Sequence, residues 1–421
     1  MSVVPVYARS TEAFIIWLIL TLAVAGFGAW KWKWHQITAI FAGILVFFPI
    51  SKIVYGEYFK WIENRREQSI RTQLERKVGS LPNIIYIILD GYGRTDVFEN
   101  TYGFSNQWFI DGLRERNFYV AMKAHSNYCQ TELSLSSSLN LQFVQNISAI
   151  KPSDIGQRPT FQSVIEGNRT MARLRQLGYQ TSAITTGFPS FNFANADIKP
   201  TKQMGTSLFE STLIQSTPLA LNDSVSVSLF STRRKLLADG LAQLSGLGAP
   251  TSRPRITFAH ILAPHPPFVF GPNGEEVPKT SAFGYWDGSD YLEKGWSADS
   301  YRKGYAGQAT YISKQILGAI DRILRESDRP PIIIIQGDHG PKLGLSQSYL
   351  EKTNIDECFP ILNAYLVPDA VKRQLYPSIT PVNSFRTIFR ALFGDNLPNL
   401  PDRSWYSPYG RPLEFTEVTK K

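Results

Sequence analysis

Runs of consecutive apolar residues recur along the chain after residue 82, and they constrain the fold more than any other feature. The first run, residues 83–89, reads NIIYIIL and does not alternate with polar residues, which is typical of a strand buried on both faces of a sheet. Similar runs follow at residues 181–186, 256–262, 332–335 and 364–367. Helical patterns occur at residues 171–177, 305–325 and 384–393. Strands that alternate with helices predict an α/β domain over residues 81–421, with a mostly parallel sheet and helices on both faces.

Two segments fit this alternation less well. Residues 211–255 carry an amphipathic stretch with flanks rich in Gly, Pro and Ser, and we expect them to lie at the periphery. Residues 271–301 are rich in Gly, Trp, Tyr and Asp, and we expect a long loop at the rim of the functional site.

Two apolar segments precede the domain, at residues 13–30 and 36–55. The first is long enough to cross a bilayer, and the second is long enough if Lys52 extends its amine to the membrane surface. The basic and aromatic turn KWKWH between them is typical of a membrane interface. We therefore predict a transmembrane helical hairpin within residues 1–56 and a helical neck over residues 57–80. The alternative is a buried helical hairpin in a soluble protein.

Charge and rare residues limit the chemistry. The chain has 44 Lys+Arg against 35 Asp+Glu, a net charge of +9, which suits an anionic lipid or phosphorylated substrate. No basic run with interleaved aromatic residues indicates a nucleic-acid partner. Two cysteines exclude a disulfide-rich scaffold and a Cys-based zinc finger. Any histidine chemistry must use one of five residues: His35, His125, His260, His265 and His339.

Polar residues end two of the predicted strands, where the chemistry of parallel sheets collects. Asp90 closes the first strand and is followed by glycine, which suits a metal ligand or a catalytic acid; the alternative is a turn cap. Asp338 and His339 follow the strand at residues 332–335, and together they can face one cation. Oxygen and nitrogen donors suit Zn or Mn better than Ca. The alternative there is a turn that carries a surface histidine.

A segment rich in hydroxyl groups, residues 126–138, begins a predicted helix. Thr131 at the helix start would lie near unpaired N–H groups and the positive end of the helix dipole, which stabilise an alkoxide and an attached phosphate. The alternative is that Thr131 is simply the N-cap.

Three further histidines are candidates for contact with substrate. His265 lies in a proline-rich loop after the strand at residues 256–262, where it can bind an oxyanion or protonate a leaving oxygen. His260 lies within that strand and is interpreted as a core histidine, with substrate binding as the alternative. His125, six residues before Thr131, is a further candidate for substrate binding.

Taken in chain order, these motifs resemble the sulfatase-like branch of the alkaline phosphatase superfamily. The motifs are strand-LDG, a Thr-x-x-Ser helix start, an HxxxPH segment and strand-GDHG, and the resemblance runs from about Pro82 to the C-terminus. It implies an alkaline phosphatase-like fold and one divalent cation held by Asp90, Thr131, Asp338 and His339. It also implies that Thr131 is the nucleophile and that His265 contacts the transferred group or the leaving group.

The residue at the nucleophile position separates the branches of this superfamily. Sulfatases use a Cys or Ser converted to formylglycine in a Cys-x-Pro/Ala-x-Arg context, whereas this chain has Thr131, lacks the Arg, and places Cys129 two residues too early. The Thr-x-x-Ser pattern is similar to lipoteichoic acid synthases and phosphoethanolamine transferases, which are anchored by N-terminal helices. The synthases usually have Glu at the position of Asp90, and the transferases carry disulfides that two cysteines cannot form. Both tend to have about five spanning helices, against two expected here.

The resemblance implies a membrane-anchored, metal-dependent transferase or hydrolase that acts through a threonine on phosphodiester head groups. Its substrate would be a membrane lipid or an envelope polymer, with the catalytic domain on the extracytoplasmic side of the cytoplasmic membrane. Basic residues after the second apolar segment would, by the positive-inside rule, place the domain in the cytoplasm instead. The alternatives are a sulfuric ester hydrolase and a catalytically inactive protein that binds envelope material.

Overall fold

The computed structural model describes residues 81–151, 158–187, 193, 195–198, 217, 223–277 and 283–419. The expected membrane hairpin and the helical neck lie outside these residues and stay predictions. Within the described ranges, no helix combines the length and the apolar character needed to cross a membrane.

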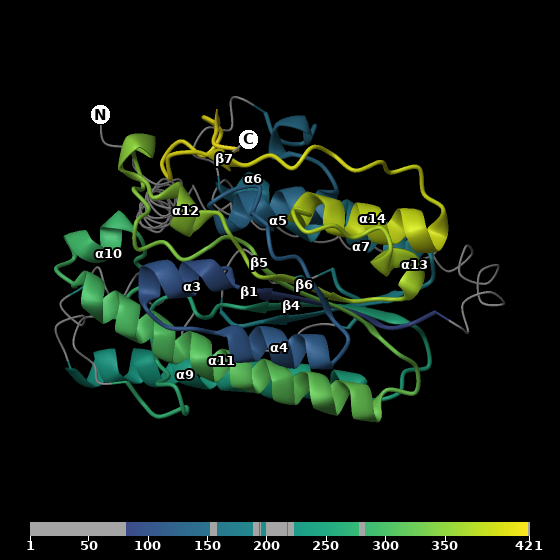
Figure 1. Ribbon diagram of the computed structural model, residues 1–421, viewed down its shortest axis with the longest axis horizontal. Helices are drawn as coiled ribbons and strands as arrows, with labels where there is room; N and C mark the ends of the chain where they lie inside the picture. Colours follow the sequence, from purple (N-terminus) through teal and green to yellow (C-terminus); the bar gives the residue numbers. More distant parts are fainter. Residues whose placement is uncertain are drawn as a thin grey trace, which may run out of the picture. The chain divides into compact units, whose positions relative to one another are not determined.

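A six-stranded sheet forms the centre of the described domain (Figure 1). Its spatial order is β2 (Tyr119–Val120), β6 (Asn363–Leu366), β5 (Ile332–Gly337), β1 (Ile84–Leu89), β4 (Arg255–Ile261) and β3 (Gln180–Thr185). Strands β3, β4, β1 and β5 run parallel, whereas β6 is antiparallel to β5 and β2 is antiparallel to β6. The prediction of a mostly parallel sheet is confirmed, and each predicted strand lies within two residues of an observed one.

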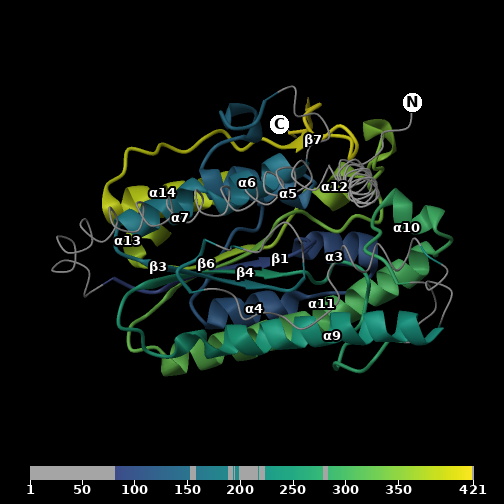
Figure 2. The same ribbon diagram turned by 180° about the vertical axis from the view of Figure 1, so that it is seen from behind.

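Helices cover both faces of this sheet, as Figures 1 and 2 show from opposite sides. One layer contains α3 (Thr95–Tyr102), α4 (Gln107–Glu115), α9 (Asp223–Ser245) and α11 (Ala298–Glu326). The other contains α5 (Thr131–Asn140), α6 (Arg158–Glu166), α7 (Arg169–Gln176), α13 (Asp369–Lys372) and α14 (Pro381–Phe393). Shorter elements are α10 (Ser289–Glu293), α12 (Ile355–Cys358), a β7–β8 pair (Trp405–Tyr406 and Thr416–Glu417), and 3-10 turns at Val144–Asn146, Gly246–Gly248 and Leu350–Lys352.

Strand β1 shows why its apolar run is continuous. Ile85, Ile87 and Leu89 belong to the hydrophobic cluster under α3, α4, α9 and α11. Residues 84, 86 and 88 belong to the cluster under α5, α7 and α14. Because successive side chains point to opposite faces, a strand between two helical layers must be apolar at every position.

The expectation that residues 211–255 lie at the periphery is wrong for their described part. Helix α9 lies beside α11 in both views, and its residues Leu237, Leu241 and Leu244 are buried in the core (Figure 2). Arg233 of the same helix is also buried, and its guanidinium donates hydrogen bonds to the carbonyl oxygens of Thr186 and Leu262. The apolar residues recur every three or four positions, so one face of α9 covers the sheet.

Candidate metal centre and active site

The register of the parallel strands gathers three metal-ligating side chains on one face. Ile88 of β1 lies opposite His260 of β4 and Gln336 of β5. Asp90 and Asp338 each come two residues further on, so they share the face of His260. One potential ligand atom from each of Asp90, His260 and Asp338 lies within 4.8 Å of the others, and all three residues are buried. The carboxyl ends of three adjacent strands therefore form one site.

His339 and Thr131 complete this group. The His339 Nε2 atom lies 3.1 Å from Thr131 Oγ1, 3.3 Å from Asp338 Oδ2 and 3.5 Å from Asp90 Oδ1. The structure thus brings together the four side chains that the resemblance assigned to one cation. It adds His260, whose Nε2 lies 3.2 Å from Asp90 Oδ2.

His260 is fully buried, as expected of a core histidine, and its Nε2 also borders the Asp90 carboxylate. The sequence does not separate His260 from a core residue, because it shares the parity of the buried Phe258 on the same strand. The Phe258 ring stacks parallel to the His260 ring on the face that carries Asp90.

The Gly91 backbone shapes the turn after β1. Its φ of 75° lies in the left-handed region that favours glycine. In this conformation the Gly91 N–H donates a hydrogen bond to Asp338 Oδ1 at 3.0 Å. The glycine after Asp90 therefore links the end of β1 to the Asp338 carboxylate at the end of β5.

The tautomer of His339 follows from its neighbours. Its Nδ1 lies 2.8 Å from the carbonyl oxygen of Gly340. A carbonyl can only accept, so Nδ1 carries the proton and Nε2 presents a lone pair. Burial, together with the charge of Lys342, holds the pKa of His339 well below its usual value and keeps the ring neutral. Nε2 is thus available to a metal ion or to the Thr131 hydroxyl.

The donor set fits a divalent cation. Both carboxylate oxygens of Asp90 and Oδ2 of Asp338 are buried and have no hydrogen-bond partner among the described residues. Burial, and then repulsion by Asp338, raise the pKa of Asp90 to about 7. Buried carboxylates without partners are costly unless a cation compensates them. Two carboxylates with imidazole nitrogens suit Zn or Mn.

Thr131 is the first residue of helix α5 and not its N-cap. Gln130 occupies the cap position with extended backbone angles, φ −120° and ψ 134°. The interpretation of Thr131 as the cap is therefore wrong, and its hydroxyl is directed to His339 instead. The N-terminal turn of a helix favours negative charge at this point.

A second polar group lies beside the first and involves His265. Its Nε2 is 3.4 Å from Asp287 Oδ2, and Lys342 Nζ is 3.9 Å from the same oxygen. Although burial lowers the pKa of Lys342, attraction to Asp287, Asp90 and Asp338 outweighs it, and the net effect is a raised pKa. Although burial raises the pKa of Asp287, His265 and Lys342 shift the balance to a lowered pKa. Both groups are therefore charged.

The sequence analysis missed Asp287 and Lys342. Asp287 lies in the segment 271–301 that was expected to form the rim of the site, but the residue itself was not predicted. Lys342 lies three residues after His339, and this short spacing was the available signal.

The other candidates lie apart from these groups. His125 forms a β-bridge with Pro360, and within the described part of the chain no hydrogen bond or ion pair joins it to the carboxylates. Burial and nearby Arg94 lower the pKa of His125. Cys129 is buried in a small apolar cluster with Cys358, and burial raises the pKa of its thiol. Its thiol is therefore protonated and shielded from solvent.

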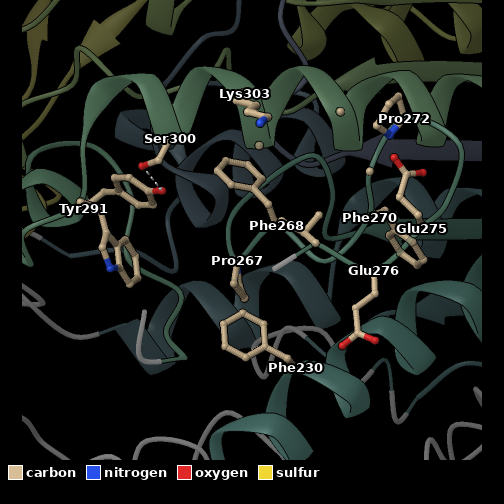
Figure 3. A pocket seen from close by; sticks show the side chains of 15 residues that line it. Phe230, Pro267, Phe268, Phe270, Pro272, Glu275, Glu276, Tyr291, Ser300 and Lys303 are labelled. Atoms are coloured by element: carbon tan, nitrogen blue, oxygen red, sulfur yellow. Dashed lines mark hydrogen bonds between the residues drawn. The ribbon is translucent and has the colours of Figure 1, made fainter. Parts of the chain in front are cut away.

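An aromatic cavity of about 310 Å³ lies next to the loop that carries His265. Pro267 and Phe268 of this loop line it together with Phe230 of α9 and Tyr291 of α10 (Figure 3). Its charged lining residues are Glu275, Glu276 and Lys303. Most of the other lining residues are aromatic or otherwise apolar.

Glu357 is a buried carboxylate outside the candidate metal ligands, and its raised pKa can be tested through the stability of the fold. Its carboxylate accepts hydrogen bonds from the Tyr102 hydroxyl at 2.6 Å and the Gly344 N–H at 3.0 Å, and burial raises its pKa to about 7. A carboxylate with a raised folded-state pKa stabilises the fold at low pH, and this stability is lost as the pH rises through 7. Glu357→Gln should therefore flatten the fall in unfolding free energy between pH 5 and pH 8, by up to roughly 3 kcal/mol.

Urea unfolding at both pH values measures this difference. The matched control is Glu414→Gln, which changes an exposed glutamate and should keep the wild-type slope. Equal slopes for wild type and Glu357→Gln would contradict the assignment.

These features define a class: an α/β domain with a candidate metal centre and a threonine at a helix N-terminus, at the carboxyl ends of a parallel sheet. The family model described as Sulfatase matches residues 82–360, more than half of the chain. The chain belongs to the sulfatase family, which confirms the resemblance to the sulfatase-like branch.

A search of curated protein sequences finds no significant match. Similar structures include the C-terminal periplasmic domain of phosphoethanolamine transferase EptC from Campylobacter jejuni, at 11% identity over 74% of this chain and 89% of that chain, with a TM-score of 0.44. The soluble domain of lipooligosaccharide phosphoethanolamine transferase A from Neisseria meningitidis has 11% identity over 74% and 88%, with a TM-score of 0.45. A 2-O GAG sulfatase has 13% identity over 77% of each chain, with a TM-score of 0.47.

Proposed function

We propose that this protein is a metal-dependent transferase or hydrolase that acts on phosphodiester head groups through Thr131. The observation that carries the proposal is the position of Thr131 Oγ1, at a helix N-terminus and 3.1 Å from His339 Nε2, beside two buried carboxylates. A hydroxyl so placed suits nucleophilic attack on phosphorus.

Different residues of the chain bind the metal and attack the substrate in this reaction. Asp90, His260, Asp338 and His339 would hold a divalent cation, with Thr131 beside them. The chemistry that such a cation supplies is neutralisation of charge on the transferred group and acidification of the threonine hydroxyl. The Thr131 hydroxyl gives its proton to solvent, and Oγ1 attacks the phosphorus while the bond from phosphorus to the leaving oxygen breaks. The N–H groups of the first turn of α5 favour the negative charge on Oγ1.

The leaving group and the second step involve the other polar group. His265 protonates the leaving oxygen, and Lys342 offers its positive charge to the oxygens of the transferred group. Water or an alcohol then attacks the phosphorus, gives its proton to the neutral His265 and releases Thr131. Attack by water is hydrolysis, and attack by an alcohol is transfer.

The chemistry of threonine favours phosphate over sulfate esters. Formylglycine is an aldehyde made from a Cys or Ser, whereas oxidation of a threonine hydroxyl would give a ketone. Cys129 is the nearest cysteine, but it is buried and lacks the surrounding motif. Sulfuric ester hydrolysis is therefore the second candidate. An inactive envelope-binding protein is the third.

The proposed location rests on the sequence. The apolar segments at residues 13–30 and 36–55 support anchorage in the cytoplasmic membrane, and the net charge of +9 suits a surface of anionic lipid. A membrane lipid or an envelope polymer on the extracytoplasmic side is the proposed substrate.

A substrate comparison tests this function. Full-length protein loaded with Zn or Mn should hydrolyse or transfer a fluorescent phosphodiester lipid, and mass spectrometry of a trapped turnover should show one phosphoryl-type adduct on the peptide containing Thr131. The peptide containing Cys129 should have its unmodified mass. Turnover of a sulfate ester with an aldehyde at residue 129 would contradict the proposal. Failure to retain metal or turn over either ester would favour the inactive protein.

A further inference from the structure

The aromatic cavity beside the candidate active site has an apolar interior and a charged mouth (Figure 3). Phe230, Phe270 and Tyr291 line it and are 9%, 2% and 7% exposed. The charged residues that line it are all exposed, so they lie at its mouth. Its volume of about 310 Å³ is at the lower end of the range of small-molecule sites, about 300–1,000 Å³. The cavity is therefore large enough for part of a substrate.

Close packing against helix α11 holds the wall of the cavity in place. Gly304 of this helix lies against the Phe268 ring, with which an added Cβ would clash. At Gly307, one turn further on, an added Cβ would lie 3.3 Å from Pro272 Cδ. The Phe268 ring also packs edge-on against Tyr301, with 5.3 Å between the ring centroids. The wall is thus fixed, and the cavity is preformed.

The loop that forms this wall also carries His265. Pro267 of the wall follows His265 by two residues, so their Cα atoms are at most about 7 Å apart. The Gln308 side chain donates to the His265 carbonyl oxygen at 3.2 Å and accepts from the Val269 N–H at 2.8 Å. A single glutamine of α11 therefore fixes the loop on both sides of Pro267. A substituent on the leaving oxygen, which lies at His265 in the proposed function, can extend into the cavity.

The lining favours one kind of substituent. Phe230, Pro267 and Phe270 offer no hydrogen-bond partner, so the hydroxyl groups of a sugar would lose water without compensation. A small ammonium group would gain from the aromatic faces, but Lys303 at the mouth repels it. A hydrocarbon chain needs only apolar surface, and its affinity rises about threefold to fourfold for each buried methylene.

We propose that this cavity is a subsite for one hydrocarbon chain, carried by the alcohol that leaves the phosphorus. The substrate is accordingly a lipid phosphodiester, and the envelope polymer is set aside. The inference rests on the proposed function for the reaction, but the cavity binds the chain whether or not the reaction takes place.

A tryptophan at the mouth of the cavity isolates this role. Ser300 lines the cavity and is exposed on α11, so Ser300→Trp should block it. The matched control is Asp299→Trp, because the Asp299 side chain is 95% exposed and does not line the cavity. Lys303→Trp, at a second exposed lining position, repeats the test if Ser300→Trp fails to fold.

The first measurement needs neither turnover nor metal. Full-length protein in phosphatidylcholine vesicles is irradiated with decyl phosphate that carries a diazirine at the end of its chain, and mass spectrometry locates the label. Residues that line the cavity should be labelled in the wild type and in Asp299→Trp, and at least about 10-fold less in Ser300→Trp. Unlabelled decyl phosphate should compete, whereas butyl phosphate, methyl glucoside and tetramethylammonium should not. No label in the cavity, equal label in Ser300→Trp, or competition by the sugar or the ammonium ion would overturn the proposal.

The second measurement compares chain lengths in the reaction. The substrates are two phosphodiesters that differ only in the leaving alcohol, butanol or decanol. The ratio of kcat/KM for the decyl ester to that for the butyl ester should be at least about 30 in the wild type and in Asp299→Trp, and below about 3 in Ser300→Trp. Equal ratios in all three proteins would reject the subsite. Absence of turnover in the wild type would count against the proposed function, and the labelling result would then decide the proposal.

Discussion

Replacing Thr131 by alanine should reduce turnover of a phosphodiester at least about 1,000-fold, because no other hydroxyl takes its place as nucleophile. The loss should fall on kcat, since the metal-binding carboxylates and imidazoles stay in place. Metal content measured on the purified variant should therefore match that of the wild type. Steady-state kinetics with one phosphodiester substrate measures the loss.

Two further variants make this experiment specific. Thr131→Ser keeps a hydroxyl at the same position and should recover a large part of the activity. Ser137→Ala removes another buried hydroxyl from helix α5 and should leave kcat near the wild-type value. Undiminished activity in Thr131→Ala would refute the proposed nucleophile.

Replacing Asp90 by asparagine should have opposite effects on stability with and without metal. In chelator at pH 8, the variant should be more stable than the wild type by roughly 1–4 kcal/mol, because a buried carboxylate with a raised pKa opposes folding above that pKa. With metal at about 100 times its Kd, the wild type should gain about 2.7 kcal/mol and the variant should gain little.

Urea unfolding in chelator and in excess Zn or Mn measures both effects. Asp96→Asn is the matched control, since Asp96 pairs with Arg94 at 2.7 Å and is partly exposed. It should keep the wild-type response to metal. If metal stabilised Asp90→Asn as much as it stabilises the wild type, Asp90 would not be a ligand. If Asp90→Asn were less stable than the wild type in chelator, the argument that burial and Asp338 raise the pKa of Asp90 would be contradicted.

Much of the fold could be predicted because its signals are local. The apolar run that became β1 needed no knowledge of its neighbours, and neither did the turn residues Asp90, Asp338 and His339. Hydrophobic periodicity and glycine turns depend on a few adjacent residues, so they survive in a single sequence. The strand that became β6 was predicted, but its antiparallel direction was not, because pairing direction depends on which strands meet. The two-residue β2 was not predicted because it is too short to give a periodic signal.

The membrane hairpin at residues 13–30 and 36–55 stays a prediction from composition, since it lies outside the described residues. The sequence around Cys129 does not match the formylglycine motif, and the structure shows in addition that Cys129 is buried.

The sequence by itself determined five of the six strands of the sheet, the strand ends that carry Asp90, Asp338 and His339, and the start of the helix that carries Thr131. Only the tertiary structure decided that His260 joins them and that Asp287 faces His265 and Lys342. The physical reason is that local order follows from neighbouring residues, whereas charge compensation in a buried site depends on distances through space between residues far apart in the chain.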